Sequence, residues 1–210
     1  MIIPVKLGYG EILDRIMASD LNDLTKATWL NPPPEWRHDD SGLSVTTGHE
    51  TDFWRETYYG FQRDSGHFLG APVQGDFTAI VTFDGAYETL YDQAGLMLRL
   101  DEQRWLKAGI EFSDGVTNFS SVVTRGRSDW AVISVPRVTG PQSVRLTRIG
   151  EAVLLHFKDA GGSWHLMRVA DFPADGEATI GIMACSPQRS GFRVLFNDFT
   201  VGPPIASPLH

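Results

Sequence analysis

The chain has 210 residues, of which 42% are hydrophobic and 21% charged, and its formal net charge is −8. This length and composition suit one globular domain with a core of ordinary size, and they exclude a disordered chain. The acidic balance argues against nucleic acid and anionic membranes as partners, because both attract clustered Lys and Arg.

The cysteine content and the first residues bear on the compartment. Cys185 is the single cysteine of the sequence, so an intrachain disulfide is excluded, which fits a reducing compartment. The opening residues lack the basic and apolar regions of a secretory signal. We therefore expect a cytoplasmic protein.

The chain divides into three predicted regions. Apolar residues at helical spacing predict a short helical or irregular arm over residues 1–27. Residues 28–202 are predicted to form one domain, and residues 203–210, which include Pro203 and Pro204, a loose tail.

From about residue 42, short strand-like runs alternate with turn pairs such as Asp84-Gly85, Asp114-Gly115 and Gly161-Gly162. Such spacing is typical of a sandwich or barrel. The predicted strands cover residues 43–47, 77–83, 94–101, 104–113, 119–124, 129–135, 143–149, 152–158, 163–169, 177–184 and 192–201.

Two of these runs show which residues face the core. Alternation along residues 94–101 and 104–113 predicts that four apolar side chains lie between two sheets. They are Leu96, Leu98, Ile110 and Phe112. The linker Asp101-Glu102-Gln103 at the junction of the two runs is short, so we expect antiparallel neighbours whose opposite faces lie side by side.

Longer strings of the sequence carry a family resemblance. FWRETYYGF (53–61), YDQAGLM (91–97) and WLKAGIE (105–111), in this order, resemble the regulation of enolase protein family, a concanavalin A-like domain family of unknown function. The resemblance spans residues 29–200. It implies an all-β jelly-roll sandwich of two antiparallel sheets, one of them concave, and it implies no common reaction.

The mixed faces of the two central strands predict a ligand-binding groove. They carry charged, amide and aromatic side chains around Gly95 and Gly109, which would leave room on the floor. The candidate groove residues, including three from neighbouring segments, are Gln93, Met97, Arg99, Trp105, Lys107, Glu111, Ser121, Trp130 and His67. The alternative is a solvated face whose ion pairs contribute little.

No string completes a catalytic or metal site. The sequence lacks the E-x-D-x-x-E and G-x-S-x-G patterns, and Glu111 and Asp114 point to opposite sides of a strand. We predict no catalytic residue, no metal and no cofactor. The leading hypothesis is an intracellular domain that binds a carbohydrate or a similar polar small ligand. One alternative is a glycoside-active enzyme with carboxylates from different strands, and another is a protein-interaction module regulating a metabolic enzyme.

Overall fold

The computed structural model describes residues 26–135 and 139–209, and β-strands dominate this part of the chain. Its strands, in chain order, are β1 (Thr28–Leu30), β2 (Glu35–Asp39), β3 (Gly42–Thr46), β4 (Phe53–Arg55), β5 (Gln62–Asp64), β6 (His67–Val73), β7 (Phe77–Gly85), β8 (Gln93–Arg99), β9 (Arg104–Ser113), β10 (Val116–Arg125), β11 (Arg127–Ser134), β12 (Gln142–Ile149), β13 (Ala152–Lys158), β14 (Trp164–Asp171), β15 (Ala178–Cys185) and β16 (Arg193–Gly202).

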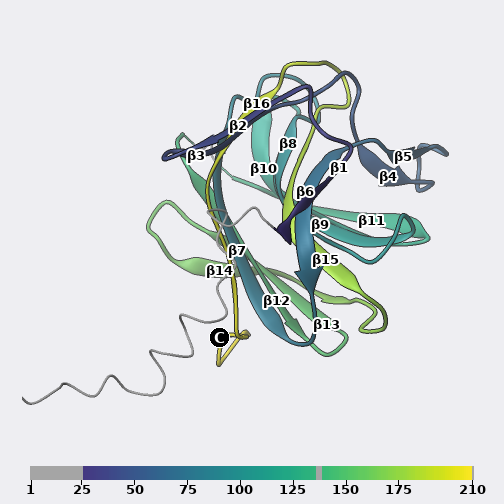
Figure 1. Cartoon of the computed structure of the whole chain (residues 1–210), viewed down its shortest axis with the longest axis vertical. Coiled ribbons are helices and arrows are strands. Elements are labelled where there is room, and N and C mark those ends of the chain that lie inside the picture. Colours follow the sequence, from purple (N-terminus) through teal and green to yellow (C-terminus); the bar gives the residue numbers. More distant parts are fainter. Residues whose placement is uncertain (1–25, 136–138, 210) are drawn as a thin grey trace, which may run out of the picture.

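Two seven-stranded antiparallel sheets form the sandwich (Figure 1). Sheet A has the order β1-β6-β15-β8-β9-β10-β11, and sheet B has the order β14-β13-β12-β7-β16-β3-β2. The short strands β4 and β5 form a separate hairpin, which Figure 1 shows beside β11. The predicted concanavalin A-like jelly-roll sandwich is confirmed.

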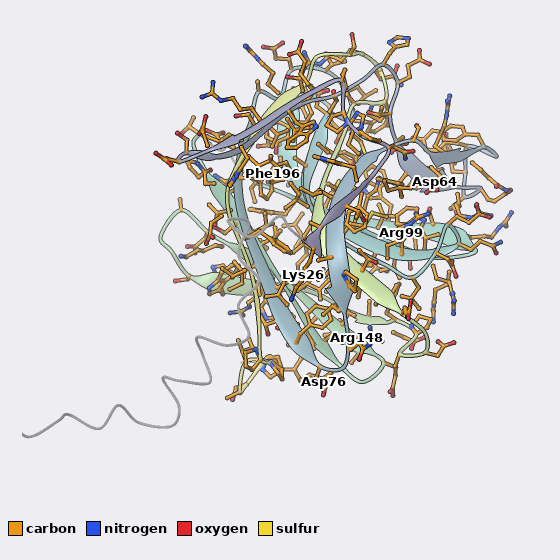
Figure 2. All side chains as sticks on the ribbon, viewed as in Figure 1. Lys26, Asp64, Asp76, Arg99, Arg148 and Phe196 are labelled. Carbon is orange, nitrogen blue, oxygen red and sulfur yellow. The ribbon has the colours of Figure 1, made fainter. Side chains whose placement is uncertain are left out.

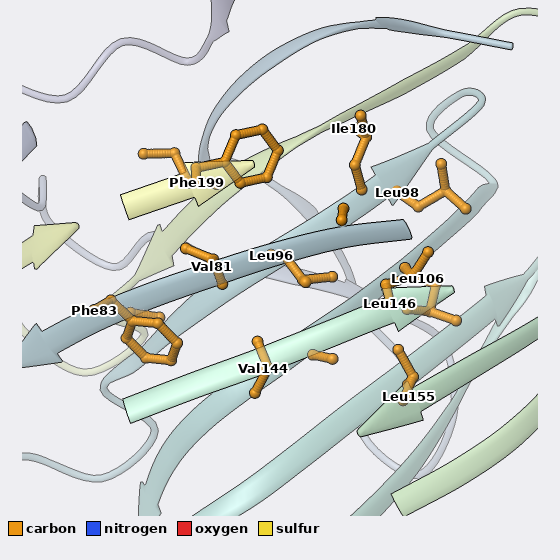
Figure 3. Close-up of a cluster of buried hydrophobic side chains, with 14 of the residues drawn as sticks. Val81, Phe83, Leu96, Leu98, Leu106, Val144, Leu146, Leu155, Ile180 and Phe199 are labelled. Carbon is orange, nitrogen blue, oxygen red and sulfur yellow. The ribbon is translucent and has the colours of Figure 1, made fainter. Parts of the chain in front are cut away.

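The core lies between the two sheets, as strand alternation predicts (Figure 3). Leu96, Leu98 and Ile110 of sheet A are fully buried against residues of sheet B such as Val81 and Val144. Phe112 is an exception, because it is only half-buried and lies outside this cluster. It sits near the end of β9, two residues before the turn to β10.

The turn chemistry is correct at one of the named pairs and wrong at another. Asp114 and Gly115 have φ angles of 54° and 80°, the positive values that a tight two-residue hairpin requires between β9 and β10. Asp84 and Gly85, expected to form a turn, instead continue β7 and pair with β16. Their ladder partners override the local turn preference.

Five strands have no counterpart in the prediction: β1, β2, β4, β5 and β6. Strand β6 contains Gly70 and Pro72, which weaken a strand signal. All five residues of β2 are exposed, so this strand shows no apolar alternation.

The ends of the chain bear on the predicted domain limits. Residues 1–25, which make up nearly all of the predicted arm, lie outside the described residues. At the other end β16 stops at Gly202. The Ile205 N–H then donates to Thr78 Oγ1 at 3.1 Å, so this part of the tail is attached to β7 rather than loose.

Candidate functional site

A second apolar cluster covers part of the face of sheet A that points away from sheet B. Its members come from β4, β6, β8, β9, β10 and β15. They are Phe53, Trp54, Phe68, Met97, Trp105, Val122, Met183 and Cys185. The β4–β5 hairpin therefore buries side chains of this face that strand alternation alone places in solvent.

Two sets of hydrogen bonds hold the hairpin in place. The Arg99 guanidinium donates to both carboxylate oxygens of Asp64, at 2.7 and 2.9 Å, and the two residues lie together in Figure 2. Bidentate pairs of this kind fix orientation as well as distance. The Arg55 N–H donates to Ser128 Oγ at 2.9 Å, which ties β4 to β11.

A cavity of about 240 Å³ lies next to the hairpin on this face. Side chains of β8 to β11, the β4–β5 hairpin and three loops line it. The lining residues are Glu50, Asp52, Trp54, Tyr59, Phe61, Arg63, Tyr91, Gln93, Lys107, Glu111, Val122, Trp130, Pro187 and Gln188. Aromatic walls and a polar floor thus meet in one concave site, as is typical of small-molecule pockets.

The structure brings four of the predicted groove residues to this cavity: Gln93, Lys107, Glu111 and Trp130. The strand register explains three of them, because β8 and β9 are antiparallel neighbours and Gln93 lies directly opposite Glu111. Trp130 comes from β11, opposite Val122 of β10. Their role in binding a ligand stays a prediction.

Three other predicted residues lie beneath the hairpin instead. Met97 and Trp105 are fully buried in the apolar cluster, so Trp105 presents no ring face to a ligand. Arg99 is occupied by Asp64. The shared physical reason is the β4–β5 hairpin, whose position over sheet A follows from contacts between distant segments.

The last two predicted residues serve other purposes. Ser121 lies opposite Ala108 in the ladder, on the side of the sheet that faces the core. His67 is buried, with Nδ1 2.7 Å from the Asn31 carbonyl oxygen and Nε2 accepting from the Gly48 N–H at 2.9 Å. Burial lowers the pKa of His67, and this neutral ring joins two loops.

Lys107 forms the positively charged part of the floor and is only 3% exposed. Its Nζ donates to the Phe53 carbonyl oxygen at 2.7 Å and to Asp52 Oδ1 at 3.2 Å. The same Oδ1 accepts from the Phe53 N–H at 2.8 Å. Lys107 is therefore fixed by a buried charge pair.

Glu111 lies on the same strand and is 5% exposed. Its Oε2 accepts from Ser120 Oγ at 3.4 Å, and Ser120 Oγ in turn accepts from Trp130 Nε1 at 3.0 Å. No described residue donates a hydrogen bond to Oε1. Burial raises the pKa of Glu111 to about 7, the Asp52 charge adds to this shift, and Lys107 opposes it. A carboxyl group with such a pKa exchanges protons readily near neutral pH.

The rim of the cavity was missed by sequence reasoning. The hydroxyls of Tyr59 and Tyr91 are 2.8 Å apart, and Tyr59 stacks on Phe61 at a centroid distance of 5.4 Å. The available signal was the aromatic run FWRETYYGF, which contains Trp54, Tyr59 and Phe61. Strand alternation does not indicate where that run lies relative to sheet A.

A second loop reaches the rim through a buried ion pair. Asp92 is fully buried, and both of its carboxylate oxygens lie 3.1 Å from Arg189 Nε. Ser186 Oγ donates to Asp92 Oδ1 at 3.0 Å. Ser186 and Arg189, which flank Pro187 and Gln188 in the chain, are thus both bound to Asp92, and this holds the two residues between them at the cavity.

The described residues contain no group of three or more His, Cys, Asp or Glu side chains placed to hold a metal ion. No helix in residues 26–135 and 139–209 is long and apolar enough to cross a membrane.

A family model described as "Protein of unknown function (DUF1349)" matches residues 29–204. The chain belongs to this family. It is also 41% identical over 195 residues to "Regulation of enolase protein 1" of Saccharomyces cerevisiae, covering 93% of this chain and 98% of that protein. The resemblance drawn from the sequence strings is thereby confirmed.

Solved structures show the same fold. The crystal structure of a functionally unknown protein from Saccharomyces cerevisiae has a TM-score of 0.82 and 42% identity, covering 87% of this chain and 99% of that one. The Bacteroides ovatus xyloglucan PUL protein GH43B has a TM-score of 0.66 and 17% identity, and the match covers 84% of this chain and 36% of the GH43B chain. At that identity the second likeness concerns the fold alone.

Proposed function

We propose that this member of the family binds a hydroxylated small molecule, of the carbohydrate class, in the cavity on the outer face of sheet A. The observation that carries the proposal is the combination in one cavity of aromatic rings with fixed polar groups. Trp130 and Tyr59 offer apolar faces for a sugar ring. Gln93, Lys107 and Glu111 offer donors and acceptors for hydroxyl groups.

The stiffness of the floor supports this proposal. Lys107 is held by Asp52 and the Phe53 carbonyl, and the Gln93 side chain donates to the Tyr91 carbonyl at 3.2 Å. A pocket whose groups are already ordered loses little conformational entropy when a ligand binds.

The test is isothermal titration calorimetry with a panel of monosaccharides and short oligosaccharides. We expect Trp130→Ala to weaken binding about tenfold, in keeping with the energy of one stacking contact. Trp36→Ala is the matched control, because Trp36 is an exposed tryptophan of β2, in the other sheet. Equal affinity of both variants, or no binding by any member of the panel, would contradict the proposal.

A glycoside-active enzyme is the second candidate, and one observation favours it. Glu111 has a pKa near 7 and shares the cavity with a second carboxylate, Asp52, from a different segment. An acid–base pair of this kind is what glycoside hydrolysis uses. Release of nitrophenol from aryl glycosides by the native chain, and its loss in Glu111→Gln, would replace the binding hypothesis by this one.

The regulatory hypothesis is supported by the name of the yeast relative, which refers to enolase. Its test is co-purification of the chain with enolase at physiological salt. A cytoplasmic location is likewise part of this proposal and is tested by imaging the tagged protein.

A further inference from the structure

The charges around the cavity are unequal once existing pairs are counted. Three carboxylates line it, from Glu50, Asp52 and Glu111, against two cations, Arg63 and Lys107. Lys107 already pairs with Asp52. The Arg63 guanidinium lies over the Phe61 ring, 5.6 Å from its centroid. Glu111 is thus a buried acid, and Lys107 on the same strand already pairs with another carboxylate.

The Glu111 carboxylate also has an unused acceptor. Its Oε1 is buried, and no residue of the described part of the chain donates to it. A buried carboxylate oxygen without a donor is costly, because it has lost its water without a replacement. Because this oxygen has almost no accessible surface, the Glu111 side chain must turn slightly toward the cavity to meet a ligand N–H group. Such a group would then satisfy it, and a charged donor makes the stronger bond.

Aromatic rings surround the same space. Trp54, Tyr59, Phe61, Tyr91 and Trp130 all line the cavity. The faces of such rings attract cations, and a cage of several rings beside a carboxylate is a recognised way to bind ammonium groups.

From these observations we infer that the preferred ligand carries a protonated amino group which binds at Glu111 Oε1, so that an amino sugar or amino polyol binds better than its neutral counterpart. This inference rests on the proposed function, because it names the ligand class of the same cavity.

The surroundings of Glu111 predict a pH signature. Lys107 on β9 lowers its pKa, whereas burial and Asp52, which precedes β4, raise it to about 7. The Tyr91 hydroxyl, before β8, and the Cys185 thiol, on β15, stay neutral at pH 7, because hydrogen bonding to Tyr59 and burial, respectively, raise their pKa values. Ser120 and Trp130 complete the surroundings as uncharged groups. A cationic ligand favours ionised Glu111, so its binding should release a proton and strengthen as the pH rises through 7.

The first experiment compares matched sugars by calorimetry at pH 7: glucose with glucosamine, galactose with galactosamine, and mannose with mannosamine. We expect the amino member of at least one pair to bind about tenfold more tightly. Glu111→Gln should remove this preference, so that the amino and neutral members of the pair bind the variant within about threefold of each other. Glu88→Gln, an exposed carboxylate outside the cavity, is the control and should keep the preference.

The second experiment needs no substitution. Ethanolamine stays protonated between pH 6 and pH 8 and keeps its N–H donors, and ethylene glycol is its neutral counterpart. We expect ethanolamine to bind the native chain more tightly at pH 8 than at pH 6, and the diol to show no such trend. A neutral sugar that binds as well as its amino counterpart, or ethanolamine affinity that does not rise with pH, would overturn the amine inference and leave the proposed function standing. Absence of binding by all sugars and amines would overturn the proposed function itself.

Discussion

Lys107 and Asp52 come from segments 55 residues apart in sequence, yet they form one buried ion pair, with Nζ 3.2 Å from Oδ1. The side chains are 4% and 14% exposed. Lys107 also donates to the Phe53 carbonyl, so a single side chain joins β9 to the start of the β4–β5 hairpin. The pair therefore has both a structural role and a place on the cavity floor.

Replacing Lys107 by Met tests the structural role. The substitution keeps the aliphatic stem but leaves the Asp52 carboxylate without its cation and the Phe53 carbonyl without the Lys107 donor. Removing one partner of a buried ion pair costs about 3 kcal/mol or more of the free energy of unfolding, to be measured by urea denaturation. Arg37→Met is the control, because Arg37 pairs with Asp39 on the surface, and its cost should stay below about 1 kcal/mol. Equal small effects would show that Lys107 does not hold the hairpin.

Replacing Leu98 by Ala tests the core. Leu98 is fully buried between the sheets, so the loss of its side chain should lower the free energy of unfolding by about 2–5 kcal/mol. Val132→Ala on β11 is the control, because Val132 is 42% exposed and its truncation should cost less than about 1 kcal/mol. A loss below about 0.5 kcal/mol for Leu98→Ala would contradict the assigned core face.

The sandwich could be predicted because its information is local. Alternation along β8 and β9 placed Leu96 and Ile110 inside, and the short connection placed the two strands side by side. The same alternation correctly put Gln93, Lys107 and Glu111 on one shared face.

What covers that face could not be predicted, because it depends on contacts between distant segments. Trp105 was expected to line the groove, but it is fully buried beneath the hairpin. The decisive contacts, such as Arg99 with Asp64, join residues 35 positions apart. No periodic pattern marks such a pair.

Gly109 corrects another expectation, and substituting it gives a third prediction. Gly95 lies directly opposite Gly109, and a Cβ at residue 109 would lie 1.9 Å from the Ala94 carbonyl oxygen. The glycines therefore allow close backbone approach rather than space for a ligand.

Gly109→Ala should lower the free energy of unfolding by about 3 kcal/mol, measured by thermal and urea unfolding, because the backbone must move to admit the Cβ. Gly202→Ala, where a Cβ has no atom within 4 Å, should cost less than about 1 kcal/mol. Similar values for both would show that β8 and β9 can separate at no cost.

The pH dependence of stability gives the last prediction. In the folded chain the pKa of Glu111 is raised from 4.5 to about 7, chiefly by burial, so the folded state holds this proton more tightly than the unfolded state. Between these two pH values the folded state binds more protons, and the free energy of unfolding falls as the pH rises. The glutamine of Glu111→Gln stays neutral at every pH, so the free energy of unfolding of this variant lacks the pH-dependent contribution of residue 111. The free energy of unfolding of Glu111→Gln minus that of the native chain should therefore rise by about 3 kcal/mol from pH 4.5 to pH 7 and level off above it. Urea unfolding of both proteins across this range measures the difference, and a constant difference would show that Glu111 is ionised in the folded state well below pH 7.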